Sequence, residues 1–226
     1  MVAEVVGVDA FRGGWVAVVL RDGSFAAAVA GARFHEVLAA VPTAGVVAVD
    51  IPIGLLERGW RRADLEARQF LGARFASVFP APPRAAAESA TYEAANQACR
   101  SLTGQGLSPM AWRLVPKILD VDRCRDEAGS RLYEIHPEVS FQALSGQPLA
   151  ASKKTWAGAA ERRVLLEGAG IILPEDLGPA GLTGTDDVLD AAVAAWSATR
   201  IAIGTARCLP DPPERDPRGR PVAIWY

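Results

Sequence analysis

Apolar residues near the start of the chain occur in short blocks, and their spacing indicates strands separated by turns. Val2 to Val8 is rich in β-branched residues and predicts a central strand. Trp15 to Leu20 and Phe25 to Ala30 predict a second and a third strand, and the Asp22-Gly23 pair between them is typical of a hairpin turn. These blocks predict a three-strand antiparallel meander.

The pattern then predicts a helix at Phe34 to Val41 and two further strands. Val46 to Asp50 is an almost continuous apolar run, as in strands that are buried on both faces. Leu132 to His136 has the same character, and Pro137 stops it because proline cannot donate to a ladder of hydrogen bonds. We expect both strands to run parallel to the first one.

Between these two strands, residues of about 55–131 are dominated by alanine, arginine and glutamate, with proline-rich breaks. This composition predicts a helical insertion with helices near 60–72, 86–101 and 110–127. Trp156 to Glu167 predicts an amphipathic helix, and Thr185 to Gly204 has the best helical spacing in the chain. Asp186 is a candidate N-cap of this last helix.

The order of elements predicts one α/β domain over residues 1–226. A meander followed by parallel strands gives a mixed sheet with helices on both faces and the insertion at about 55–131, which matches the RNase-H-like topology. In that topology the first strand is central, and the carboxyl ends of the parallel strands share one edge of the sheet, where open α/β sheets place their ligands.

Composition narrows the class of partner and the compartment. The formal net charge is -2, so no global positive field draws the protein to nucleic acid, and a nucleic-acid contact needs a local patch. The first residues lack a basic region, and no apolar stretch is long enough to span a bilayer, so we expect no membrane contact. The 3 scattered cysteines predict neither disulfides nor a zinc site and fit a cytoplasmic protein.

Carboxylates stand where the predicted parallel strands end. Asp9 follows the first strand, Asp50 ends the fourth, and Glu134 lies near the end of the fifth. On the last helix, Asp187 and Asp190 are spaced to share one face. Acids gathered in a partly dry cleft need protons or a cation, and Mg²⁺ or Mn²⁺ suits oxygen ligands. Taken alone, Asp9 or Asp50 has the alternative of a turn residue, and Asp186 that of a helix cap, whereas Asp190 stands in an otherwise apolar helix and needs a partner.

The lysines and one arginine of the chain are candidates for phosphate binding. All lysines of the chain, Lys117, Lys153 and Lys154, lie in short motif-like phrases of a protein whose other basic residues are arginines. Arg12 precedes the Gly13-Gly14 pair, which could let backbone amides approach a phosphate. A solvated surface for the lysines, and a hairpin turn for the glycines, are the alternatives.

His136 alternates with two glutamates, Glu134 and Glu138. On a strand end these three side chains would point to one face, where the imidazole could shuttle a proton or bind substrate. A structural histidine with ordinary hydrogen bonds is the alternative.

Several short motifs run along nearly the whole chain: GVDAFRGGW, DIPIGL, SVFPAPPR, PKI, EIHPEVSF, SKKT, TDDVLDAAVAAW and the terminal IWY. In these motifs the chain resembles an uncharacterised bacterial family of predicted RNase-H-like nucleases. This resemblance implies metal-assisted hydrolysis of phosphodiesters, with Asp9 bridging two metals and with Asp50 and Asp187 or Asp190 completing the sites. Glu134 is not a standard ligand in that superfamily.

Three functions follow as alternatives. The first is a hydrolase: a magnesium- or manganese-dependent nuclease or phosphodiesterase acting on nucleic acid or a small phosphoester. The second is a non-catalytic module that binds a metal or a ligand on the same scaffold. The third is a phosphotransferase-like nucleotide binder, against which the absence of a GxxxxGK[ST] loop counts.

Overall fold

The computed structural model describes residues 4–226, so the start of the predicted first strand lies outside the described residues. The chain is a mixed α/β fold with a seven-strand sheet, and it divides into two compact units. The first contains residues up to 50 with 124–207 and 225–226, and the second contains 51–123 and 208–224. Each unit is described by itself below.

Five strands of the sheet come from the first unit: β1 (Val5–Phe11), β2 (Gly14–Arg21), β3 (Ser24–Gly31), β4 (Val46–Val49) and β5 (Leu132–Ile135). β2 pairs antiparallel with β1 and with β3, which confirms the meander. β1 pairs parallel with β4, and β4 pairs parallel with β5, as predicted. The strand order β3-β2-β1-β4-β5 therefore places β1 in the middle of these five.

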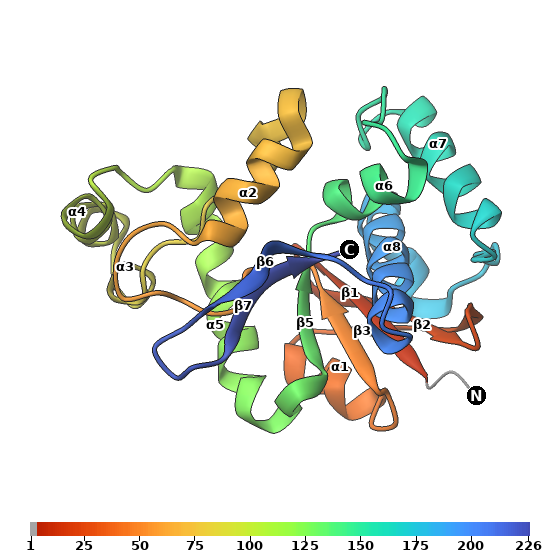
Figure 1. The fold of residues 1–226 in the computed structure, drawn as a ribbon. Helices are drawn as coiled ribbons and strands as arrows, with labels where there is room; N and C mark the ends of the chain where they lie inside the picture. The colour runs from red at the N-terminus through yellow and green to blue at the C-terminus, as the bar shows by residue number, and fades with distance from the viewer. Residues whose placement is uncertain (1–3) are drawn as a thin grey trace. The chain divides into compact units, whose positions relative to one another are not determined.

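Helices of the first unit cover both faces of its strands (Figure 1). They are α1 (Phe34–Ala40), α6 (Pro137–Ser145), α7 (Trp156–Gly168) and α8 (Thr185–Ala202), with short 3-10 turns at Gly129–Arg131 and Gly178–Leu182. α8 packs against β1, β2 and β4. α1 packs on the other face, where the rings of Trp15 and Phe34 meet edge to face at 5.2 Å.

Alternate residues of β2 show how the two faces are shared. Val16, Val18 and Leu20 are fully buried in the same core cluster as the apolar residues of α8. Trp15, next to this set, turns to the face of α1. Because side chains on a strand alternate between faces, the buried block of β2 is apolar throughout.

Gly7 lets α8 lie directly on β1. A Cβ atom at this position would stand 2.0 Å from the backbone nitrogen of Ala195 and 2.1 Å from the carbonyl oxygen of Ala191. Only glycine permits so close an approach. The helix backbone is thus held against the middle strand, on the face toward which Asp9, two residues further along β1, also points.

The second unit contains α2 (Arg62–Leu71), a 3-10 turn at Gly72–Ser77, α3 (Arg84–Ala87), α4 (Tyr92–Thr103) and most of α5 (Pro109–Ala128). It also holds β6 (Cys208–Arg215) and all but the last residue of β7 (Pro221–Trp225). A small apolar cluster of α3 and α4 includes Ala86, Ala95 and Cys99, all fully buried. Among residues 4–226 no helix is long and apolar enough to cross a membrane.

The structure differs from the sequence-based prediction at several elements. The predicted helix at 86–101 is the two helices α3 and α4, and α6 was not predicted, although Pro137 stands at its first position as proline often does. β6 and β7 were missed because β6 contains prolines, which an edge strand tolerates. Gly184 is the N-cap of α8, so the prediction that Asp186 caps this helix was wrong.

Candidate metal centre

Asp9 and Asp50 come together because β1 and β4 are parallel neighbours. The register pairs Val8 with Val49, and beyond it the amide of Asp50 donates to the carbonyl of Val8 at 2.9 Å. The residues that follow this pair, Asp9 and Asp50, therefore sit side by side on one face of the sheet. It is the face that α8 covers, because Gly7 lies against that helix.

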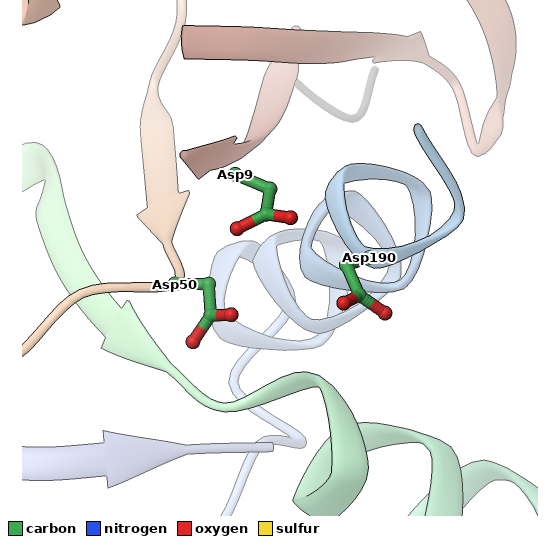
Figure 2. Close-up of side chains that lie close together, drawn as sticks. All are labelled: Asp9, Asp50 and Asp190. Atoms are coloured by element: carbon green, nitrogen blue, oxygen red, sulfur yellow. The ribbon is translucent and has the colours of Figure 1, made fainter. Parts of the chain in front are cut away.

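Asp190 completes the group from α8. Asp9, Asp50 and Asp190 each offer a carboxylate oxygen, and these oxygens all lie within 4.8 Å of one another. Figure 2 shows the three side chains pointing toward a common space, two from strand ends and one from the helix. The predicted convergence is confirmed for these three residues. We call them the acidic cluster.

The acidic cluster is removed from solvent. Asp190 is 0% exposed and Asp9 is 5% exposed, while Asp50 is partly buried. The amide of Ala10 donates to Asp9 Oδ1 at 2.7 Å. The buried Oδ1 of Asp190 has no hydrogen-bond partner among residues 4–226. A buried carboxylate oxygen without a donor is costly, so this atom is placed to accept a cation or a proton.

Burial raises the pKa of every member of the acidic cluster, and the charges of neighbouring carboxylates add to this effect. Burial, followed by the charges of Asp50 and Asp190, raises the pKa of Asp9 well above its usual value. Burial raises the pKa of Asp50 to about 6, against the opposing charge of Lys153. Burial likewise raises the pKa of Asp190 to about 7, again opposed by Lys153. Without a bound cation the acidic cluster therefore favours protonated carboxyl groups, because the buried acids lack enough positive charge to ionise together.

Lys153 is the cation that the chain itself supplies. Its ammonium group forms an ion pair with Asp190 and lies 4.0 Å from Asp186. Burial alone would lower the pKa of Lys153, but the charges of Asp190 and Asp50 outweigh it and raise this pKa. Lys153 was predicted as a substrate-binding residue; the structure places it on a carboxylate of the acidic cluster.

The start of α7 holds Lys153 in place. Thr155 caps this helix, since its hydroxyl accepts from the amide of Gly158 at 3.1 Å, and the same hydroxyl donates to the carbonyl of Ser152 at 2.8 Å. A Cβ at Gly158 would stand 2.0 Å from that carbonyl oxygen. The loop before α7 is therefore pressed against the helix, which fixes the position from which Lys153 reaches Asp190.

A buried ion pair stands behind this loop. Arg162 is 0% exposed and donates to Glu138 at 2.6 Å and to the carbonyls of Gly158 and Ala151 at 3.1 and 3.3 Å. The charge of Glu138 contributes to the raised pKa values of Asp50 and Asp190. Glu138 and Arg162 thus belong to the surroundings of the acidic cluster, and neither was predicted as a site residue.

Of the other acids predicted on the last helix, Asp187 lies one turn before Asp190. It is partly buried, and burial together with the charge of Asp186 raises its pKa. Its charge is also felt at Asp9, but Asp187 is not among the three residues whose oxygens converge. Lys154 forms an ion pair with Asp186 rather than with the acidic cluster.

Glu134 points away from the acidic cluster. It pairs with Val49 in the parallel register, while Asp50 follows Val49 on the opposite face. Glu134 is buried, and its carboxylate is not part of the converging set. The single-face arrangement of Glu134, His136 and Glu138 is also not formed, because His136 is the N-cap of α6 and Glu138 belongs to the first turn of that helix.

The remaining predicted residues lie elsewhere. Arg12 is exposed in the turn between β1 and β2. Lys117 is a partly buried residue of α5 and belongs to the second unit.

The sequence signal for Glu138 and Arg162 was weak but present. Glu138 follows Pro137, and a proline followed by an acid is a common start of a helix. Arg162 stands in the middle of an amphipathic helix, where an arginine on the apolar face requires a partner. Glu138 was considered only as part of a strand end, and recognising α6 would have placed it in the first turn of a helix instead.

Comparison with known proteins adds a family and no activity. Residues 7–215 match a family described as a protein of unknown function, DUF429. No curated protein and no solved structure matches the chain.

Proposed function

We propose, starting from the fact that the chain belongs to the DUF429 family, that this protein is a divalent-metal-dependent hydrolase of phosphodiesters, a nuclease or phosphodiesterase. The observation that carries the proposal is the acidic cluster: three carboxylates from three separate elements within 4.8 Å of one another, largely buried and with raised pKa values. A protein keeps such a destabilising group where a cation neutralises it.

The donors suit Mg²⁺ or Mn²⁺. The acidic cluster offers carboxylate oxygens alone, which hard divalent cations prefer, whereas zinc sites generally include histidine or cysteine. The unpartnered Oδ1 of Asp190 supplies an acceptor that no residue of the described chain uses. Asp9, Asp50 and Asp190 are the proposed ligands, and Asp187, one turn along α8, is placed to join them from the partly buried rim.

A divalent cation bound here would activate water and stabilise the charge that develops on the phosphate oxygens. The protein's own groups do the rest. Asp9, Asp50 and Asp190 would hold the cation through their carboxylate oxygens, and their burial would keep bulk water from competing with it. Lys153 and Lys154 place ammonium groups beside the acidic cluster, where a phosphate would need counter-charge.

The scaffold supports the same conclusion. The strand order is β3-β2-β1-β4-β5, and β2 is the one strand of these five that runs in the opposite direction to the others. This is the arrangement expected for the RNase-H-like topology. Asp9 and Asp50 stand on the central and fourth strands, where that superfamily places acids. We therefore propose that the first unit is an RNase-H-like domain.

The test is hydrolysis of a substrate panel with Mg²⁺ or Mn²⁺: single- and double-stranded DNA, RNA, branched junctions and bis(p-nitrophenyl) phosphate. We expect cleavage that EDTA abolishes and that Asp9→Asn reduces by roughly a thousandfold, since a catalytic metal supplies several kcal/mol. Asp122→Asn, an acid paired with Arg84 in the second unit, is the matched control and should retain activity.

Absence of cleavage on every substrate, with the variants folded, would refute the hydrolase. Intact Mg²⁺ binding in that case would identify a non-catalytic module that binds a metal or a ligand. The unpartnered oxygen of Asp190 favours a bound cation in either case.

A further inference from the structure

A groove of about 790 Å³ runs along α7 beside the acidic cluster. Its lining includes Lys153, Lys154, Trp156, Ala160, Arg163 and Val164. The groove and the acidic cluster are joined by Lys153, which lines the groove and forms the ion pair with Asp190. A molecule that fills the groove therefore reaches Lys153, the residue that contacts the acidic cluster.

The wall of the groove is apolar and aromatic. Trp156 is 90% exposed and Val164 is 65% exposed, although most side chains of this size are at least partly covered in a folded protein. Trp156, Ala160 and Arg163 are spaced by three and four residues, so they share one side of α7. A tryptophan at the first position of a capped helix, next to a small residue, is a flat and rigid surface on which a ring can stack.

The charges of the groove favour an anion close to that surface. Lys153, Lys154 and Arg163 line it together with the acids Asp186 and Glu167. Lys154 and Asp186 neutralise each other in an ion pair. Arg163 is exposed and forms no ion pair within residues 4–226, so its guanidinium is available to a ligand. Arg163 follows Trp156 by seven residues of α7, which is about 10 Å along the helix axis.

We propose that this groove binds single-stranded nucleic acid, with one base stacked on Trp156 and a neighbouring phosphate held by Arg163. The strand then continues past Lys153 toward the acidic cluster, which places a phosphodiester at the site of hydrolysis. This inference rests on the proposed function and names its substrate class. Stacking on an aromatic residue beside cations is a recurrent way to bind single strands without regard to sequence.

The experiment measures binding rather than cleavage. A short fluorescein-labelled oligothymidylate is titrated with the full chain in EDTA, and fluorescence anisotropy reports the dissociation constant. Trp156→Ala should weaken binding roughly tenfold, whereas Trp156→Phe, which keeps an aromatic face, should retain most of it. Arg163→Gln should lower the slope of log K against log salt concentration by about 0.7, the value for one phosphate contact on a single strand.

Control variants and ligands separate binding in the groove from nonspecific binding to exposed apolar surface. Leu182→Ala, which also removes a 90% exposed apolar side chain but does not line the groove, should bind the oligonucleotide as the wild type does. A duplex of the same length should bind more weakly, because its bases are already stacked. A mononucleotide competitor tests whether one nucleotide unit is enough or several phosphates are required.

Unchanged oligonucleotide binding in Trp156→Ala would overturn the proposal and leave the exposed tryptophan to another class of partner, such as a protein segment. The outcome is independent of the hydrolase. Cleavage of bis(p-nitrophenyl) phosphate without Trp156-dependent binding would refute the groove alone, and Trp156-dependent binding without any cleavage would refute the hydrolase alone.

Discussion

The molecule buries aspartate in two different ways. In the second unit, Asp64 is 1% exposed and accepts from Arg61 at 2.5 and 3.1 Å and from the amide of Ala81 at 2.9 Å. Arg61, also 1% exposed, donates in addition to the carbonyl of Ile53 at 3.2 Å. The charge of Asp64 is thus matched by an arginine and its oxygens are matched by donors.

The acidic cluster of the first unit is built without that balance. Three carboxylates share the single ammonium of Lys153, and the buried Oδ1 of Asp190 has no donor within residues 4–226. Burial of charge costs desolvation free energy in both regions. Only for Asp64 and Arg61 do contacts within the protein offset this cost. The difference separates an acid whose charge is balanced within the fold from acids that we propose to bind a cation, and four experiments test it.

The largest effect is expected from breaking the buried ion pair of Asp64 and Arg61. Asp64→Asn removes the counter-charge of a buried arginine and should lower the free energy of unfolding by about 3–5 kcal/mol, measured by urea denaturation. Asp122→Asn, which breaks the more exposed pair with Arg84, is the control and should cost about 1 kcal/mol or less. Equal losses in the two variants would mean that burial does not set the strength of these pairs.

Mg²⁺ should stabilise the protein through the acidic cluster. At a free concentration of about one hundred times the dissociation constant, a ligand that binds only the folded state adds ~2.7 kcal/mol to the free energy of unfolding. Thermal unfolding with and without Mg²⁺ measures this increment. Asp9→Asn should lose it and Asp122→Asn should keep it. An undiminished increment in Asp9→Asn would place the cation elsewhere.

In the absence of metal, the acidic cluster should make the protein more stable as the pH falls from about 8 to 5. Burial raises the folded pKa of Asp190 to about 7, against an unfolded value near 4, so between these values the folded state holds a proton that the unfolded state has released. Protonation therefore favours folding. Over this range the wild type should gain roughly 2 kcal/mol relative to Asp190→Asn.

Urea denaturation in EDTA at several pH values measures that difference between the wild type and Asp190→Asn. Saturating Mg²⁺ should remove it, because the cation then neutralises the carboxylate in place of the proton. If stability depends on pH in the same way in the two proteins in EDTA, the pKa of Asp190 is not raised in the folded state and the prediction is wrong.

The smallest effect concerns the cation that the chain supplies. Lys153→Gln removes the ammonium group that forms an ion pair with Asp190, so Mg²⁺ should bind roughly tenfold more tightly. Isothermal titration calorimetry measures this change in affinity. Lys154→Gln, whose wild-type ammonium pairs with Asp186 instead, should change the affinity little. Weaker Mg²⁺ binding in Lys153→Gln would mean that the lysine supports the cation site rather than competing with it.

Strand periodicity and composition predicted the first unit well. The β-branched blocks gave the meander and the parallel strands, and the position of an acid after each parallel strand gave Asp9 and Asp50. Asp190 was predictable because an acid within an apolar helix needs a partner. These residues were found because their local pattern alone determines which element and which face they occupy.

Other features depended on information that local patterns lack. Glu134 was included because it lies near a strand end, but the register puts it beside Val49 and so on the opposite face from Asp50. The partner of Lys153 depends on how the loop before α7 packs, which involves Gly158 and Thr155. The strand β6 was hidden because prolines argue against strands unless the strand lies at an edge.

The contact at Gly7 sets the distance between the two elements that carry Asp9 and Asp190. Asp9 and Asp190 are carried by different elements, and the spacing between those elements is set where a missing side chain lets the backbone of α8 touch β1. Even a methyl group there would push helix and strand apart and carry the two carboxylates with them. Gly7, which offers no ligand atom itself, thus sets the spacing of the proposed ligands, and a larger residue there would change that spacing without replacing any of the three aspartates.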